Sequence, residues 1–136
     1  MKVLMVCLGN ICRSPLAEGI LKSKVSKNIK VDSAGTAAWH SGNLPDKRSI
    51  AVAKTYGIDL TDQRARQFLV EDFDRFDYIY VMDKSNYVNV CKLAPNNEAI
   101  DKVELILNES HSGKDLEVPD PYYGGDDGFE NVFQML

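Results

Sequence analysis

Residues 3–15 read VLMVCLGNICRSP and decide the fold. The apolar run from Val3 to Val6 stops at a loop that contains Gly9, a pattern typical of a strand buried on both faces of a parallel sheet. A helix is expected directly after the loop, because Ser14 is a candidate cap, Pro15 suits a first turn, and apolar residues then recur at helical spacing. The segment therefore predicts a strand, a short loop and a helix in close succession.

The rest of the chain alternates strands and helices. We expect strands at 29–32, 78–82 and 103–107, and helices at 46–56, 68–73, 83–93 and from 129 to the last residue. Such alternation, joined by right-handed crossovers, predicts an α/β fold with a small four-stranded parallel sheet and helices on both faces. Because no linker, repeat or low-complexity stretch divides the sequence, we expect residues 1–136 to form a single domain.

Composition argues against several kinds of partner. The chain has 136 residues, 44% of them hydrophobic and 26% charged, which is ordinary for a globular domain. A net charge of −4 argues against nucleic acid as a partner, since binding to its phosphate backbone normally shows as a basic surplus. No apolar stretch has the length of a membrane span or a signal-peptide core, so we expect a cytoplasmic location and no membrane partner.

The three cysteines predict thiols rather than a disulfide framework. Cys7, Cys12 and Cys91 are odd in number, and their spacing does not match the paired patterns of zinc ligands. Cys91 falls in an expected amphipathic helix, where packing is the simplest role. We expect no metal and no cofactor.

The loop after the first strand has the composition of an anion site. Five residues separate the thiol of Cys7 from the guanidinium of Arg13. Backbone N–H groups of such a loop converge on one point, and the helix N-terminus adds a partial positive charge. We therefore predict a phosphate-binding loop after the first strand, made of Leu8, Gly9, Asn10, Ile11, Cys12, Arg13 and Ser14, with Arg13 as a bidentate fork.

Cys7 is the candidate nucleophile of this loop. Thiols at helix N-termini and beside cations ionise more readily than free cysteine, and the thiolate is the reactive form. Attack on phosphorus would give a phosphocysteine intermediate. Gly9 permits close backbone approach, Asn10 tolerates the left-handed region, and Ser14 is placed to donate a hydrogen bond to the sulfur.

A candidate general acid lies late in the chain. Asp120 stands between Pro119 and Pro121, which stiffen the backbone around its carboxyl group, and Tyr122 and Tyr123 are candidate walls for a flat phenyl ester. Taken alone, Asp120 is better explained as a turn residue before proline. Together with Cys7 it suggests an acid that protonates the leaving oxygen and then deprotonates the attacking water.

These motifs resemble the low-molecular-weight protein tyrosine phosphatases over nearly the whole chain. Besides 7–14 and 120–123, the resemblance runs through 32–36, Trp39, 45–48, 64–67, 76–78 and 82–83. It implies a cytoplasmic, metal-independent phosphatase without a cofactor, acting as a monomer on a phosphotyrosine-containing protein or a small aryl phosphate. It also implies that Cys7 is the nucleophile, Arg13 the phosphate clamp and Asp120 the acid/base, and that Trp39, Tyr122 and Tyr123 wall the substrate site.

Two departures from the family pattern stand out. Gln63 occupies a position where many members carry histidine, so we expect a different hydrogen-bond network behind Asn10. The sequence stops at Leu136 on an apolar position, so we expect the last helix to be truncated at its C-terminal end. The role of Cys12 stays open between packing and, as the family resemblance suggests, a protective disulfide with Cys7.

Two other functions remain as alternatives. Thioredoxin-coupled arsenate reductases resemble this chain in fold and use a similar loop. They need two further cysteines close together, whereas only Cys91 lies in the comparable region of this chain. A phosphate-binding module that does not hydrolyse its ligand is the other alternative. Asp120 argues against it, since such a module needs no acid/base.

Overall fold

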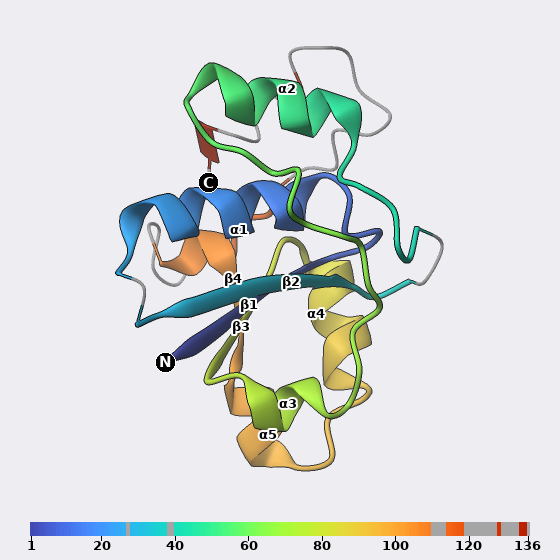
Figure 1. Ribbon diagram of the computed structural model, residues 1–136. Helices are drawn as coiled ribbons and strands as arrows, with labels where there is room; N and C mark the ends of the chain where they lie inside the picture. The colour runs from blue at the N-terminus through green and yellow to red at the C-terminus, as the bar shows by residue number, and fades with distance from the viewer. Residues whose placement is uncertain (27, 38–39, 110–113, 119–127, 129–133, 136) are drawn as a thin grey trace.

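The computed structural model describes residues 1–26, 28–37, 40–109, 114–118, 128 and 134–135. Four parallel strands form one sheet in the order β2-β1-β3-β4 (Figure 1). The strands are β1 (Lys2–Cys7), β2 (Lys30–Gly35), β3 (Tyr78–Val81) and β4 (Val103–Leu105). The predicted four-stranded parallel sheet is therefore confirmed.

Strand β1 lies inside the sheet, between β2 and β3. All of its residues after Lys2 are buried, as the continuous apolar run predicts for a strand covered on both faces. Its last residue, Cys7, is in register with Gly35 at the end of β2. Since ligands of open α/β sheets bind beyond the carboxyl ends of the strands, the fold places Cys7 at the edge where a site is expected.

Helices cover both faces of the sheet (Figure 1). On one side lie α1 (Arg13–Lys24) and, beyond it, α2 (Lys47–Thr55). On the other side lie α3 (Asp72–Arg75), α4 (Lys84–Cys91) and α5 (Asn97–Asp101), and a short 3₁₀ helix spans Ile106–Asn108 after β4. No helix in the described part of the chain is long and apolar enough to cross a bilayer.

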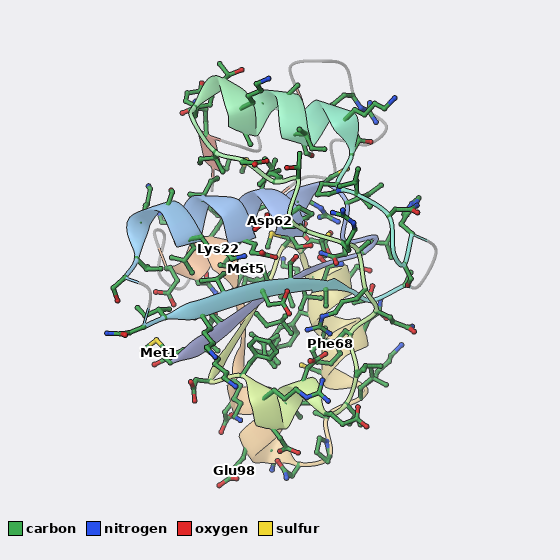
Figure 2. All side chains as sticks on the ribbon, viewed as in Figure 1. Met1, Met5, Lys22, Asp62, Phe68 and Glu98 are labelled. Atoms are coloured by element: carbon green, nitrogen blue, oxygen red, sulfur yellow. The ribbon has the colours of Figure 1, made fainter. Side chains whose placement is uncertain are left out.

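Alternate residues of β1 pack into two separate apolar cores, one on each face of the sheet. Val3 and Met5 pack on the α1 side with Leu16, while Leu4 and Val6 pack on the opposite side. Figure 2 shows this division, with Met5 between the sheet and α1 and Phe68 on the face that α3 covers. Two dry cores around a strand buried on both faces hold the carboxyl end of β1 in a fixed place.

Three local predictions differ from the structure. Ser14 does not cap α1: the helix begins at Arg13, with Cys12 at the N-cap position and no side-chain cap, because the Ser14 hydroxyl bonds Cys7 and Asn10 instead. The helix expected at 68–73 begins only at Asp72, since residues before it pair with the end of β2. Helix α5 was not predicted, although Asn96 caps it by accepting from the Ala99 N–H. The expected final helix lies largely outside the described residues.

Candidate active site

The thiol of Cys7 lies buried at the start of the loop, with polar partners around its sulfur. Its Sγ is 3.0 Å from the Ser14 hydroxyl oxygen, and the backbone N–H of Asn10 donates to it at 3.3 Å. The Cys7 residue is only 3% exposed. The sulfur of Cys7 is therefore buried and held between a hydroxyl group and a backbone N–H, two groups that can donate hydrogen bonds to it.

Asn10 fixes the direction of the hydrogen bond between Ser14 and Cys7. Its φ angle of 56° is left-handed, as its identity predicts. Its side-chain Nδ2 donates to Ser14 Oγ at 2.8 Å, and its Oδ1 accepts from the backbone N–H of Arg66 at 3.0 Å. Because Ser14 Oγ already accepts from Asn10, its own proton is available to donate to Cys7 Sγ.

Gly35 makes room for the loop, a role that the sequence analysis did not assign. A Cβ atom at Gly35 would stand 2.8 Å from the backbone oxygen of Leu8 and 3.1 Å from the backbone nitrogen of Asn10. Just beyond Gly35, the N–H of Thr36 donates to the Cys7 carbonyl. The end of β2 and the loop thus touch backbone to backbone, which only glycine allows at this position. The sequence predicts a strand only as far as Asp32, but β2 continues to Gly35, which places this glycine at a strand end beside the loop.

The side chain of Arg13 is held from one side by an acid. Its Nη1 donates to Asp83 Oδ2 at 2.6 Å and to the backbone oxygen of Val118 at 2.9 Å. Asp83 is itself fixed, because its other oxygen accepts from the N–H of Asn86 and caps α4. The guanidinium is therefore oriented before any ligand arrives. No local sequence pattern assigns this task to Asp83.

The remaining loop residues are anchored to α2 and its surroundings. The Ile11 carbonyl accepts from the N–H of Asp46 at 2.7 Å. Ile11 and Cys12 pack in a small buried cluster with Ala65, and Val52 lies against it. The contacts of Cys12 in this cluster are packing contacts. Formation of a disulfide with Cys7 under oxidation stays a prediction.

Gln63 takes part in the support of α1 rather than of Asn10. Its Nε2 donates to the carbonyl of Pro15 in the first turn of the helix, at 3.2 Å. Within the described part of the chain its Oε1 is buried and has no hydrogen-bond partner. Asn10 is held instead by the backbone of Arg66. A changed network behind the loop, relative to family members that carry histidine at this position, stays a prediction.

A buried carboxyl group lies one turn along α1 from Ser14. Glu18 accepts hydrogen bonds from Ser33 at 2.7 Å and from Lys22 at 2.5 Å. Burial raises the pKa of Glu18 above its ordinary value, and the hydrogen bonds from Lys22 and Ser33 offset only part of this effect. The acid joins α1 to β2 beneath the loop.

Several predicted site residues lie outside the described part of the chain. These are the proposed acid and the three aromatic walls: Asp120, Trp39, Tyr122 and Tyr123. Among the described residues, no group of three or more histidine, cysteine or acidic side chains is placed to hold a metal ion.

Comparison with known proteins decides the family. The family model described as low molecular weight phosphotyrosine protein phosphatase matches residues 2–136. The chain belongs to this family. A relative of that description from Schizosaccharomyces pombe is 44% identical, with 99% of this chain and 89% of the relative covered. The human low molecular weight phosphotyrosine protein phosphatase is 43% identical, with 98% and 87% covered.

Solved structures of this family share the fold. A protein tyrosine phosphatase from Entamoeba histolytica, crystallised with Hepes in its active site, has a TM-score of 0.89 at 38% identity. The match covers 99% of this phosphatase and 88% of the Entamoeba chain. Vibrio vulnificus Wzb in complex with benzylphosphonate has a TM-score of 0.89 at 32% identity, with 98% and 90% covered. The predicted fold and the predicted enzyme class, a protein tyrosine phosphatase, are thereby confirmed.

Proposed function

We propose that this phosphatase hydrolyses aryl phosphomonoesters through a phosphocysteine on Cys7. The observation that carries the proposal is the ordered set of hydrogen bonds at its sulfur, in which Asn10 donates to Ser14 and Ser14 is left to donate to Cys7. This set lies in a loop at the carboxyl end of β1 and leads into α1, so the helix N-terminus and Arg13 add positive charge where a phosphate would bind.

The first step transfers the phosphoryl group to sulfur. The Cys7 thiolate attacks phosphorus in line, the S–P bond forms, and the bond between phosphorus and the phenolic oxygen breaks. Arg13 and the loop N–H groups stabilise the charge on the equatorial oxygens. Asp120 gives its proton to the leaving oxygen, so that a neutral phenol departs rather than a phenolate.

The second step releases inorganic phosphate. Asp120, now a carboxylate, takes a proton from a water molecule that attacks phosphorus. The S–P bond breaks and its electron pair returns to Cys7 as thiolate. The hydroxyl of Ser14, 3.0 Å from the sulfur, stabilises this leaving group by donating its proton in a hydrogen bond. The enzyme returns to its starting state without a metal or redox change.

Chain connectivity supports the choice of Asp120 as the acid. Val118 is fully buried, its N–H donates to the Met82 carbonyl at 2.7 Å, and its own carbonyl accepts from Arg13. Asp120 follows Val118 by two positions in the sequence. The described chain is therefore held at the proposed phosphate clamp two residues before the proposed acid.

The aromatic residues support an aryl ester as the substrate. Tyr122 and Tyr123 follow the proposed acid, and Trp39 precedes His40, whose ring lies against the loop. A Cβ atom at Gly9 would stand 3.1 Å from the Cδ2 atom of His40. A structural relative binds benzylphosphonate, which carries a phenyl ring beside a phosphonate. We infer that the substrate is a phosphotyrosine-containing protein or a small aryl phosphate.

The test is hydrolysis of phenyl phosphate and p-nitrophenyl phosphate with EDTA present. Cys7→Ser should abolish turnover of both. Asp120→Asn should slow phenyl phosphate more than p-nitrophenyl phosphate, because p-nitrophenolate leaves without a proton more readily. Asp126→Asn, a matched change in the same stretch of chain, should leave both rates close to wild type.

Two results would overturn the proposal. Undiminished turnover by Cys7→Ser would remove Cys7 as the nucleophile. An equal fall of kcat/KM for both substrates in Asp120→Asn would remove Asp120 as the acid, because kcat/KM does not include the hydrolysis of phosphocysteine that both substrates share. Reduction of arsenate with thioredoxin by a wild-type protein that does not hydrolyse phenyl phosphate would favour the arsenate reductase alternative.

A further inference from the structure

An ion pair behind the phosphate-binding loop has no role in the mechanism so far. The guanidinium of Arg66 forms a fork with the carboxylate of Asp72, with Nη1 3.0 Å from Oδ2 and Nη2 3.2 Å from Oδ1. Nη2 also lies 3.3 Å from an oxygen of Asp32. The Asp72 side chain is fully buried, while the Asp32 side chain is about half exposed. Two arms of unequal burial therefore hold one arginine.

The buried arm is a fixed point in the structure. Besides the two bonds from Arg66, the Asp72 carboxylate accepts from the backbone N–H of Leu69 at 2.8 Å. A buried carboxylate with three hydrogen bonds is firmly oriented. Arg75 is a second, more distant cation, with Nη1 3.9 Å from Oδ1 of Asp72. Asp72 also begins α3, and the next residue of that helix, Phe73, is buried in the core on this side of the sheet.

The backbone of Arg66 joins this fixed point to the loop. Its carbonyl accepts from the Gly35 N–H at 2.8 Å, and two residues later the Phe68 N–H donates to the Gly35 carbonyl at 2.6 Å. Its own N–H donates to Asn10 Oδ1 at 3.0 Å. One residue thus connects the buried acid, the end of β2 and the side chain that orients Ser14.

We propose that Arg66 is a positioning residue for the nucleophile, acting through Asn10 and Ser14 on the sulfur of Cys7. The inference rests on the proposed role of Cys7. The fork with Asp72 fixes the Arg66 peptide, and its N–H then fixes the carboxamide of Asn10. With its Oδ1 occupied, the amide presents Nδ2 to Ser14 Oγ, and the Ser14 proton is directed at the sulfur.

Loss of this anchor should reduce kcat more than it raises KM. If the Arg66 N–H moves, the Asn10 amide is free to rotate and Ser14 is free to turn its proton away from Cys7. The thiolate then loses a hydrogen bond that stabilises it both as nucleophile and as leaving group. Phosphate binding by the loop backbone and Arg13 is less affected, since Asp83 and Val118 hold Arg13 independently.

The experiment compares Arg66→Met with Arg64→Met. Arg64 lies two residues earlier, is exposed, and donates to the carbonyls of Thr61 and Gln63. Arg66→Met should lower kcat on phenyl phosphate by about tenfold to a hundredfold, with KM changed less than about threefold. The pH midpoint of inactivation by iodoacetate, with alkylation of Cys7 verified by peptide mass spectrometry, should rise by about one pH unit. Arg64→Met should change neither quantity.

A double-mutant cycle separates positioning from loss of folding. Asn10→Gly keeps a residue that tolerates positive φ but removes the carboxamide. If Arg66 acts through Asn10, then adding Arg66→Met to Asn10→Gly should reduce kcat little further. Arg66→Lys, which keeps the charge but not the fork, should fold and lose part of the activity. Asp32→Asn removes only the exposed arm, so it should stay within about threefold of wild type.

The outcomes are distinguishable from failure of the proposed function. Two outcomes would overturn the positioning role. One is additive losses of kcat in the double-mutant cycle, and the other is an Arg66→Lys variant that loses thermal stability but keeps the wild-type alkylation midpoint and kcat. In both cases an inactive Cys7→Ser would still support the mechanism. An active Cys7→Ser would instead remove the mechanism on which the inference rests.

Discussion

Removing the Ser14 hydroxyl tests the hydrogen bond to the nucleophile most sharply. In the structure Ser14 Oγ lies 3.0 Å from Cys7 Sγ and accepts from Asn10 at 2.8 Å. A hydrogen bond to a charged partner contributes about 1.5–3 kcal/mol. At about 1.4 kcal/mol per pH unit, Ser14→Ala should move the pH midpoint of Cys7 alkylation upward by about one to two units.

The same variant should slow the second chemical step. The departing thiolate loses its donor when the S–P bond breaks, so the phosphoenzyme should accumulate and p-nitrophenol should appear in a burst close to one equivalent per enzyme. Iodoacetate inactivation against pH and stopped-flow absorbance provide the two measurements. Ser23→Ala is the matched control, because Ser23 is on the same helix and its hydroxyl donates to the Ile20 carbonyl away from the site. A wild-type midpoint together with no burst in Ser14→Ala would refute the reasoning.

Three further changes test the supports of the site. Because burial raises the pKa of Glu18, the folded state binds its proton more tightly than the unfolded chain. The free energy of unfolding should therefore fall as pH rises from the ordinary pKa of glutamate towards the raised pKa of the folded state. Glu18→Gln should remove this dependence in urea titrations at a series of pH values, and an unchanged slope would contradict it. Asp46→Ala removes the acceptor for the Arg48 N–H at the start of α2 and should lower the free energy of unfolding by about 1 kcal/mol, whereas no change would show that the cap is dispensable. Gly35→Ala places a Cβ atom 2.8 Å from the Leu8 carbonyl and should reduce kcat by about tenfold to a hundredfold in steady-state assays, whereas full activity would show that the loop can shift without loss.

The sequence predicted what depends on neighbouring residues. The apolar run of β1, the glycine and asparagine of the loop and the apolar stripe of α1 lie within one continuous stretch, so the strand, the left-handed Asn10 and the helix all followed from local rules. Ser14 is the exception within that stretch. A serine before proline is typical of a helix cap, but here tertiary contacts with Cys7 and Asn10 take its hydroxyl instead.

The residues that the sequence analysis missed act across long chain separations. Asp83 reaches Arg13 from the end of another strand, and Arg66 reaches Asn10 from a segment that has no regular structure of its own. From the sequence alone, Asp83 is sufficiently explained as the cap of the helix that follows it. Arg66, in a polar stretch, is sufficiently explained as a solvated side chain. Only the sheet order, which brings β1 beside both β2 and β3, shows that these side chains surround one loop.

The most direct test of the central claim is identification of the phosphorylated residue during turnover. Wild-type enzyme mixed with phosphotyrosine and quenched in acid within the first turnover should carry one phosphoryl group, and peptide mass spectrometry should place it on Cys7. Ser14→Ala should carry more of it than wild type, because its second step is slower. Turnover without any phosphoryl group on Cys7, or with the group on another residue, would contradict the account.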